Sequence, residues 1–276
     1  MPVHDELGKR MKSYYENISK TKLMRRTPVI IRLDGKAFHT FTKGFKKPFD
    51  EVLIKAMQKT TKYLCENIQG CVFGYTQSDE ITLVLVDYKK LNSDAWFDYE
   101  VQKMCSIAAS TASIAFNRFF WDEVDYYCVD NYINCAGIND VLSVYKTLDR
   151  LKETDPVLVS YIECKSALFD ARCFNIPKEE VTNCVYWRQI DATRNSIQMV
   201  GQANFSHNEL HKKTCNMIQE MLHEQKGINW NDFPTYLKRG TAVKKDESGQ
   251  WIIDLDMPQL KGDGRAYLDD LIMVGE

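Results

Sequence analysis

The sequence predicts a mixed α/β fold in which helices pack against one sheet. The first observation behind this prediction is the order of patterns over residues 28–87, where a buried strand, an amphipathic helix and two β-rich runs follow one another. A strand, a crossover helix and a hairpin in this order place all three strands in one sheet. The second observation is composition: 44% hydrophobic and 27% charged residues among 276 are ordinary for a globular protein with a sizeable core.

The first strand is expected at 28–34 (PVIIRLD), after a charged helical pattern at 4–19. Successive side chains of a strand point to opposite faces. One face of this strand carries Val29, Ile31 and Leu33. The other face carries Ile30 and Arg32, so the strand is predicted to be buried.

A loop is expected over 35–50, because this stretch contains Pro48 and ends at Asp50, a favourable N-cap residue. An amphipathic helix then follows at 51–68. The two β-rich runs after it are separated only by QSDE, and so short a connection predicts a β-hairpin. These runs span 71–76 and 81–87.

The remaining patterns predict three helices, a strand and a small C-terminal β tail. The helices are expected at 98–120, from 178 onward and at 206–225. In the first of them an Ala/Ser stripe would lie close against a sheet. Ser206 and Glu209 have the spacing of a capping box. The strand is expected at 166–176 and the tail at 251–256 and 271–274. Residues 121–163 are aromatic and acidic without a clear period, and they receive no assignment.

Composition limits the possible functions. A formal net charge of −2 excludes a protein-wide basic field, so a nucleic acid would have to meet local patches. Such patches occur at 20–26, 43–47, 211–213 and 237–245. Nine cysteines without a CxxC pair indicate free thiols in the cytoplasm rather than disulfides or structural zinc. The polar N-terminus does not resemble a signal peptide, and no apolar run is long enough to span a membrane.

Two acids mark the ends of the predicted strands. Asp34 ends the first strand, and Asp79 lies in the turn of the hairpin. If the first strand runs alongside the hairpin toward its turn, both carboxylates share one edge of the sheet and repel each other unless a cation lies between them. Oxygen ligands suit Mg²⁺, and paired metals serve phosphoryl and nucleotidyl transfer. The alternative is that both acids only terminate strands, since Asp is common in turns.

Seven motifs occur in order along most of the chain: RLDGKAFHTF (32–41), FKKPFD (45–50), YTQSDEITLV (75–84), KxxSxAAS (103–110), FDAR (169–172), WRQID (187–191) and GINWNDFPTYLKRGT (227–241). Together they resemble the tRNA-His guanylyltransferase superfamily, the reverse polymerases that add nucleotides to the 5′ end of tRNA in the 3′→5′ direction. The resemblance implies a palm-like antiparallel sheet with flanking helices, similar to that of forward polymerases, and two Mg²⁺ ions.

The same resemblance implies a cytoplasmic nucleotidyltransferase that is a homotetramer. Its substrates would be ATP, GTP and other nucleoside triphosphates, and its partner the 5′ end and acceptor stem of tRNA. On this basis residues 1–135 hold the palm-like catalytic core. Residues 136–276 hold the rest of the core, a helical RNA-contacting region and the β tail, and the two parts form one integrated domain.

Roles for individual residues also follow from the resemblance. Asp34 and Asp79 would be metal carboxylates, and Gly35 would give a backbone carbonyl to one metal. Glu80 and Lys47 would support catalysis, Glu80 by orienting ligands or holding the structure. The nucleotide would be bound by Asp34, Gly35, Lys36, Ala37, Phe38, His39, Ser78, Asp79 and Lys103. Taken singly, His39, Lys47 and Lys103 also fit ordinary surface positions.

One departure separates two activities within the family. Eukaryotic-type members carry His-Ile-Asn-Asn-Leu-Tyr-Asn after WRQ-x-D, whereas this chain has TRNSIQM at 193–199. That resembles the bacterial and archaeal guanylyltransferase-like proteins, which repair truncated 5′ ends against a template. The rival activity is guanylate addition to tRNA-His alone. More distant alternatives are a catalytically silent palm that binds RNA or nucleotide, and a nucleotide cyclase, for which WRQID and GINWND give no support.

Overall fold

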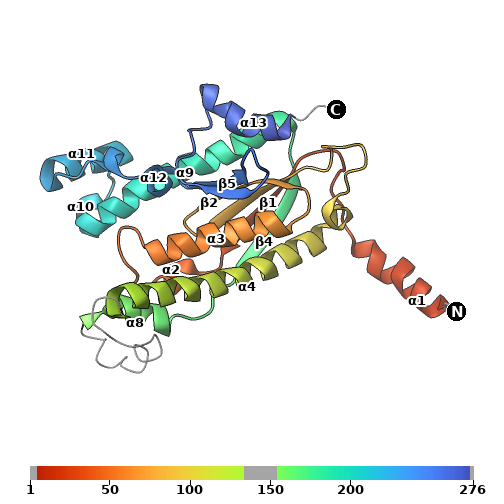
Figure 1. Ribbon diagram of the computed structural model, residues 1–276, viewed down its shortest axis with the longest axis horizontal. Helices are drawn as coiled ribbons and strands as arrows, with labels where there is room; N and C mark the ends of the chain where they lie inside the picture. The colour runs from red at the N-terminus through yellow and green to blue at the C-terminus, as the bar shows by residue number, and fades with distance from the viewer. Residues whose placement is uncertain (1–4, 134–153, 274–276) are drawn as a thin grey trace.

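A six-stranded antiparallel sheet forms the centre of the molecule (Figure 1) in the computed structural model, which describes residues 5–133 and 154–273. The strand order is β4-β1-β3-β2-β5-β6, and each neighbouring pair is antiparallel. The strands are β1 (Val29–Gly35), β2 (Cys71–Gln77), β3 (Glu80–Leu85), β4 (Phe169–Asn175), β5 (Thr241–Lys245) and β6 (Trp251–Asp254). The predicted fold class is confirmed. Strands from both sides of residue 135 share this one sheet.

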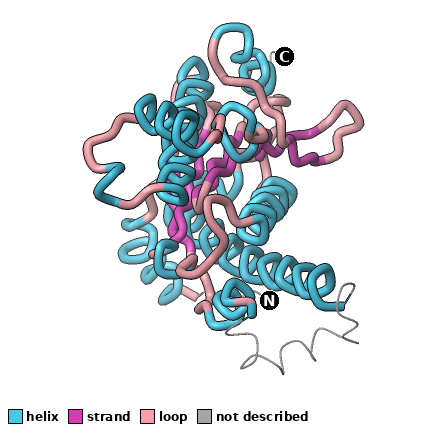
Figure 2. The backbone as a smooth tube through the Cα atoms, turned by 90° about the vertical axis from the view of Figure 1, so that its left-hand side faces the viewer, coloured by secondary structure: helices cyan, strands magenta, loops and turns pink. Residues whose placement is uncertain are grey.

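Helices cover both faces of the sheet. Those that form the main layers are α3 (Glu51–Asn67) and α4 (Val101–Cys128) on one face, and α9 (Lys178–Asn204) and α13 (Ala266–Ile272) on the other. The shorter ones are α1 (Glu6–Met11), α2 (Phe38–Phe41), α8 (Pro156–Glu163), α10 (His207–Leu210), α11 (Cys215–Lys226) and α12 (Thr235–Arg239). Figure 2, turned by 90°, shows most of the strands lying between helices, while one strand-and-loop segment extends beyond them at the right. The part of the chain that the structure describes contains no helix long and apolar enough to cross a membrane.

The alternation along β1 explains how the two layers form. Its odd-numbered apolar residues pack with α3 and α4, while Ile30 joins the cluster under α9 and α13. The predicted small-residue stripe on α4 is also present, since Ala108 and Ala112 are fully buried against the sheet. Burial of these apolar side chains away from water is the main force that holds the layers together.

A short helix, α2, occupies part of the stretch 35–50 that the sequence predicts as a loop. Its Phe38 and Phe41 rings pack on Phe116 of α4, with ring centroids 5.5 and 5.7 Å away. One turn of helix is unstable by itself, so this tertiary contact, rather than any local period, fixes it.

The predicted helix at 98–120 is longer than expected, because α4 runs to Cys128. A 3₁₀ turn at Trp96–Tyr99 precedes it. Part of the unassigned segment 121–163 is therefore helical, in α4, at Val129–Ile133 and in α8. The rest of that segment, 134–153, lies outside the described residues.

The predicted helix at 206–225 is two helices, α10 and α11. The capping box is present, since Ser206 and Glu209 bond to each other's backbone N–H. Lys212 then has a φ of 60°, which ends the helical course, and Thr214 caps α11. A left-handed residue between two caps is incompatible with one continuous helix.

The predicted β tail is correct in its first part and wrong in its second. Residues 251–254 form β6, which pairs with β5. The run 271–274, in contrast, begins inside α13. Leu268 and Ile272 are fully buried on one face of that helix, and their spacing of one turn decides for helix over strand.

Candidate active site

Asp34 and Asp79 lie together at one end of the sheet. β1 runs antiparallel to β3 with Asp34 opposite Glu80, and the Gly35 N–H donates to the Asp79 carbonyl oxygen at 3.1 Å. Ser78 has a φ of 51° at the hairpin turn, and its hydroxyl donates to Asp79 Oδ1 at 3.0 Å. The strand thus ends beside the turn, in the arrangement that the strand pattern predicts.

Both aspartates have a raised pKa. For Asp34 the cause is burial first and then the negative charges of Glu80 and Asp170. For Asp79 it is again burial first, and Asp34 adds to it while the Ser78 hydroxyl opposes it. Carboxylates that are pushed toward protonation by burial and by one another favour a bound cation.

A row of acids crosses three strands on the face toward α9. Asp170 of β4 pairs with Asp34 of β1, which pairs with Glu80 of β3. Directly opposite residues of antiparallel strands point to the same face. In the next row along the strands Arg172 pairs with Arg32, so positive charge lies beside negative charge.

The members of that acidic row differ in their partners. Glu80 is buried and accepts from Arg32 Nη2 at 2.9 Å and from Arg188 Nε at 2.7 Å. Asp170 accepts from Arg172 at 2.9 Å. The Asp34 carboxylate has no hydrogen bond or ion pair of less than 4 Å within the described part of the chain, so it remains available to a ligand. Glu80 therefore lies in a structural ion pair rather than toward the open edge.

The residues at this edge fit Mg²⁺. A metal here would take Asp34, Asp79 and the backbone carbonyl of Gly35 as protein ligands. No group of three or more His, Cys, Asp or Glu side chains is arranged to hold a metal within residues 5–133 and 154–273. Mg²⁺ uses one or two carboxylates and completes its shell with water and substrate phosphates. Glycine is required at 35, because a Cβ there would lie 2.2 Å from the Phe38 ring.

A cavity of about 480 Å³ opens beside Asp79. Seven residues predicted for the site line it: Gly35, Ala37, Phe38, His39, Lys47, Ser78 and Asp79. Lys46 and Lys47, from the loop before α3, also line the cavity and supply positive charge. A cavity lined by both carboxylate and lysine side chains suits a triphosphate bound with a divalent cation.

Three predicted nucleotide contacts, Asp34, Lys36 and Lys103, do not line this cavity. Asp34 directly precedes Gly35, which does line it. The Lys36 side chain is exposed and does not line the cavity, although its N–H donates to the Leu168 carbonyl at 2.8 Å. Lys103 lies near the start of α4, with its ammonium 4.5 Å from the Phe97 ring centroid. The residue of α4 that contacts the start of β4, close to the site, is Ser113, whose Oγ accepts from the Phe169 N–H. Lys103 lies ten residues earlier on that helix. The structure does not bring Lys103 to this cavity.

Sequence reasoning did not single out Asp170 and Gln77, which lie near the site. Asp170 belongs to the FDAR motif, and its alternation with Arg172 along a strand was the available signal. Gln77 precedes the hairpin turn and lines a second cavity next to the first. Asp170 and Gln77 come near the site only through the order of the strands in the sheet, and local sequence patterns do not predict that order.

Comparison with known proteins gives a family match over most of the chain. The family model described as tRNAHis guanylyltransferase matches residues 8–177. Two solved structures of a bacterial tRNA(His) guanylyltransferase-like protein are similar: one in complex with ATP, at 36% identity and a TM-score of 0.78, covers 98% of this chain and 100% of its own. The other, in complex with GTP, has 34% identity and a TM-score of 0.71, with 97% and 99% covered. The tRNA(His) guanylyltransferase of Saccharomyces cerevisiae is 24% identical over 79% of this chain and 82% of its own length.

Proposed function

Because the chain belongs to the tRNA(His) guanylyltransferase family, we propose that it is a 3′→5′ polymerase that repairs truncated 5′ ends of tRNA against a template. Membership makes it a nucleotidyltransferase that acts in tRNA processing and binds nucleotides. The proposal adds the direction of growth, the template and the ions. ATP and GTP are the first candidates as substrates, since the similar bacterial structures hold them.

The observation that carries this proposal is the lysine-containing cavity that Gly35, Ser78 and Asp79 line, with Asp34 next to Gly35 at the end of β1. A bound cation would stabilise the ionised form of the two carboxylates, whose pKa values burial raises, and the nearby Lys46 and Lys47 suit phosphates. A silent RNA-binding palm has no use for such a pair, because unneutralised acids repel an RNA phosphate.

Two group transfers make up the proposed reaction. In the first, an oxygen of the RNA 5′-monophosphate attacks the α-phosphorus of ATP, and pyrophosphate leaves. In the second, the 3′-hydroxyl of a nucleoside triphosphate attacks the activated 5′-phosphorus, and AMP leaves. Mg²⁺, held by Asp34, Asp79 and the Gly35 carbonyl, would neutralise charge on the phosphoryl oxygens.

The protein's own groups hold and align the reactants. The Ser78 hydroxyl fixes the Asp79 carboxylate, and Lys47 meets the negative charge of a triphosphate or of the RNA end. Catalysis then rests on electrostatics and alignment. No side chain is required as a general base, which fits a cavity where His39 is the only histidine that lines it within the described residues.

RNA binding would use local basic patches on several subunits. A net charge of −2 gives no protein-wide basic field, so phosphates would meet the clusters at 20–26, 43–47, 211–213 and 237–245 without sequence preference. We propose a homotetramer in the cytoplasm. The helical segment at residues 6–19 supports assembly, because it exposes several large apolar side chains and buries none.

Template-dependent repair is favoured over obligatory addition to tRNA-His by the stretch 193–199. In place of the eukaryotic-type signature, its residues serve packing: Ser196 Oγ accepts from Trp230 Nε1 at 3.0 Å, and Ile197 lies in a buried cluster with Trp230. The sequence identity is also higher to the bacterial guanylyltransferase-like protein, 36%, than to the yeast enzyme, 24%. This too favours repair.

The test is 5′ extension of truncated tRNA. Substrates lacking the first nucleotide and ending opposite C, A, G or U are incubated with all four nucleoside triphosphates and Mg²⁺, and we expect incorporation of G, U, C and A respectively. A mismatched base misplaces the attacking hydroxyl, which can cost about 100-fold in rate. Full-length tRNA-His should be the poorer substrate. Addition of G alone, whatever base lies opposite and only to tRNA-His, would replace repair by the rival activity.

A further inference from the structure

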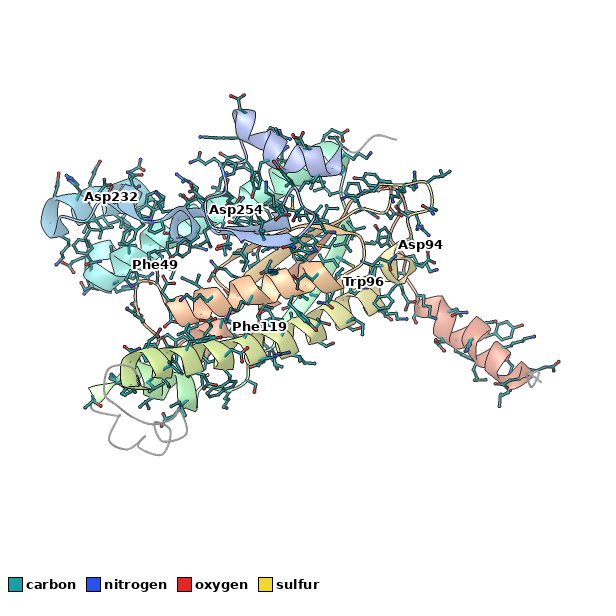
Figure 3. The ribbon with its side chains drawn as sticks, viewed as in Figure 1. Phe49, Asp94, Trp96, Phe119, Asp232 and Asp254 are labelled. Carbon is teal, nitrogen blue, oxygen red and sulfur yellow. The ribbon has the colours of Figure 1, made fainter. Side chains whose placement is uncertain are left out.

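Two cysteine side chains meet where the start of α4 packs on β4. Cys105 lies in the second turn of α4, and Trp96, labelled in Figure 3, marks the 3₁₀ turn that leads into this end of the helix. Cys173 lies on β4, 68 residues later in the chain. The two Sγ atoms are 3.5 Å apart, and the Cys105 thiol donates to the Cys173 sulfur. The fold thus brings two thiols from distant segments into direct contact.

The direction of the Cys173 side chain follows from the alternation along β4. Cys173 pairs with Ile31 of β1, which is buried on the face toward α4, whereas the preceding residue, Arg172, lies on the opposite face. The Cys173 thiol also donates to the Val101 carbonyl oxygen of α4, at 3.9 Å. The sheet therefore separates the thiol pair from the row of acids, and the role of the pair does not depend on the proposed function.

A disulfide between these two sulfurs requires only a small movement. An S–S bond is about 2.05 Å long, so the atoms have to approach each other by about 1.5 Å. Both cysteines are partly buried rather than enclosed, which leaves them accessible to a small oxidant. Cys65, in contrast, is 2% exposed in the core under α3. Contact and access thus occur together at Cys105 and Cys173.

The existing contacts between β4 and α4 differ along the strand. β4 is the edge strand of the sheet and pairs with β1 alone among the described strands. Near its start the Ala167 N–H donates to Asn117 Oδ1 at 2.9 Å. The Phe169 N–H donates to Ser113 Oγ at 3.0 Å. At Cys173 the polar contacts to α4 involve sulfur, which is a weak donor and a weak acceptor, so a disulfide there would replace weak contacts by a covalent bond.

We propose that Cys105 and Cys173 form a modification site, at which hydrogen peroxide produces a disulfide that fastens β4 to α4 and that a thiol reductant reverses. First, the Cys105 sulfur attacks a peroxide oxygen. An S–O bond forms, the O–O bond breaks, and the hydroxide that leaves takes the thiol proton to become water. Next, the Cys173 sulfur attacks the Cys105 sulfur. An S–S bond forms, the S–O bond breaks, and the second hydroxide takes the Cys173 proton. The two sulfurs lose two electrons, and peroxide is reduced to two waters.

The surroundings of the two thiols assign the order of these steps. Burial, and after it the hydrogen bond from Cys105, raises the pKa of Cys173 to about 12. A thiol that stays protonated reacts slowly with peroxide, so Cys105 is the residue oxidised first and Cys173 is the one that resolves the sulfenic acid. Because Cys173 is already in contact, it traps this intermediate before further oxidation to the irreversible sulfinic acid.

The experiment treats the full, reduced chain with hydrogen peroxide, alkylates the remaining thiols and maps the tryptic peptides by mass spectrometry. Trypsin places the two residues in separate peptides, 104–118 and 173–178, each with one cysteine. We expect these peptides to be joined after peroxide and to separate after reduction with dithiothreitol. The oxidised chain should unfold about 5 °C or more above the reduced chain, because the bond closes a long loop.

Serine variants provide the controls. Cys105→Ser and Cys173→Ser each remove one sulfur and keep a side chain of similar size. In both variants the joined peptides should be absent, and peroxide should not raise the unfolding temperature. Cys215→Ser is the matched control, since Cys215 is partly buried at the start of α11, and it should behave as wild type does. Thermal unfolding of the reduced variants verifies that they are folded.

Two outcomes overturn the assignment. The first is recovery of the two wild-type peptides unjoined after peroxide, with their cysteines alkylated or converted to sulfinic acid. The second is joined peptides without a rise in unfolding temperature, which would mean that the bond does not fit the native packing of β4 on α4. A wild type that forms the disulfide but extends no RNA would overturn the proposed function and leave this assignment intact.

Discussion

The carboxylates of Asp79 and Glu80 follow one another in sequence but have different partners. Asp79 lies at the open turn, whereas Glu80 lies between Arg32 and Arg188. We predict that Glu80→Ala lowers the free energy of unfolding by about 3 kcal/mol or more, because it leaves two largely buried guanidinium groups without their common partner. Arg32 Nε already has no hydrogen-bond partner among the described residues. Urea denaturation measures the loss.

The control for Glu80 is Asp191→Ala, which removes the other carboxylate of Arg188, at 2.8 Å. Asp191 is more exposed than Glu80, so the loss should be about 1 kcal/mol or less. Equal stability of wild type and Glu80→Ala would contradict the structural role and return Glu80 to a role in catalysis alone.

Asp34 and Asp79 should behave in the opposite way. We predict that Asp34→Asn and Asp79→Asn each abolish 5′ nucleotide addition and leave the metal-free protein folded, since either change removes a metal ligand and relieves repulsion between the two acids. The control is Asp170→Asn, in the same row of the sheet but paired with Arg172, which should keep most activity. Activity within about tenfold of wild type in saturating Mg²⁺ for either aspartate variant would contradict the metal assignment.

The raised pKa values of Asp34 and Asp79 predict how Mg²⁺ stabilisation depends on pH. An acid whose pKa is raised in the folded state favours folding while it is protonated, and that contribution is lost as pH rises through the folded pKa. Mg²⁺ needs the ionised form. The rise in thermal midpoint on adding Mg²⁺ should therefore be small near pH 3.8, the ordinary aspartate value, and grow toward neutral pH. The Asp34→Asn, Asp79→Asn double variant should lose the effect at every pH.

The meeting of Asp34 with Asp79 could be predicted because it depends on local order: a strand that ends in an acid and a hairpin turn that contains another. The position of Asp170 beside Asp34 could not, because β4 comes much later in the chain and pairs with β1 only after β2, β3 and several helices. Gln77 lies within a quoted motif, but its burial depends on α9, which the alternation of β2 does not reveal. Contacts between distant segments are set by packing of the whole core.

At the scale of elements, the loop before α3 positions Lys47 through one buried side chain. Asp50 accepts from the Lys46 and Leu53 N–H groups, each at 2.9 Å, and from the Tyr161 hydroxyl at 2.7 Å. We predict that Asp50→Ala lowers the free energy of unfolding by about 2–4 kcal/mol, from the lost cap and the unpaired hydroxyl. It should also weaken nucleotide binding, because the loop no longer holds Lys47 in place.

The matched control for Asp50 is Thr214→Ala, which removes the N-cap of α11 away from the cavity. It should cost about 1 kcal/mol and leave nucleotide affinity unchanged. A combined measurement of chemical denaturation and calorimetric nucleotide titration separates the two effects. Nucleotide affinity that is the same for Asp50→Ala and wild type would remove the loop from the binding argument.

The elements that the sequence predicts well are those with a strong period and a clear start. β1, α3 and the β2–β3 hairpin have both. The break between α10 and α11 was missed because hydrophobic spacing continues across it, while the left-handed Lys212 has no sequence signal as clear as glycine. The helical end of the chain was missed because an apolar run of four residues fits a strand and a buried helix equally well.

At the scale of the whole molecule, one helical segment has no core of its own. Residues 6–19 form α1 and the two helical turns after it, and none of them is buried. Figure 1 shows α1 projecting from the body. Five exposed apolar side chains recur along it at helical spacing: Leu7, Met11, Tyr14, Tyr15 and Ile18. A one-sided apolar stripe on a helix is the pattern of a packed face, so the proposed tetramer gives it a partner in another copy of the chain.

The assembly can be tested through that stripe. We predict that light scattering coupled to size exclusion finds a tetramer for wild type and a smaller species for the Leu7→Glu, Ile18→Glu double variant, because two charges would have to be buried without partners. Lys9→Glu, on the exposed charged side of α1, is the control and should assemble as wild type does. Subunits that share RNA would lose it when separated, so the double variant should also extend truncated tRNA more slowly while binding free nucleotides normally. A tetramer that survives the double change would place the interface elsewhere. A monomeric wild type would remove the shared RNA surface from the proposal, because each net-acidic chain would then have to hold the RNA phosphates with its own basic clusters.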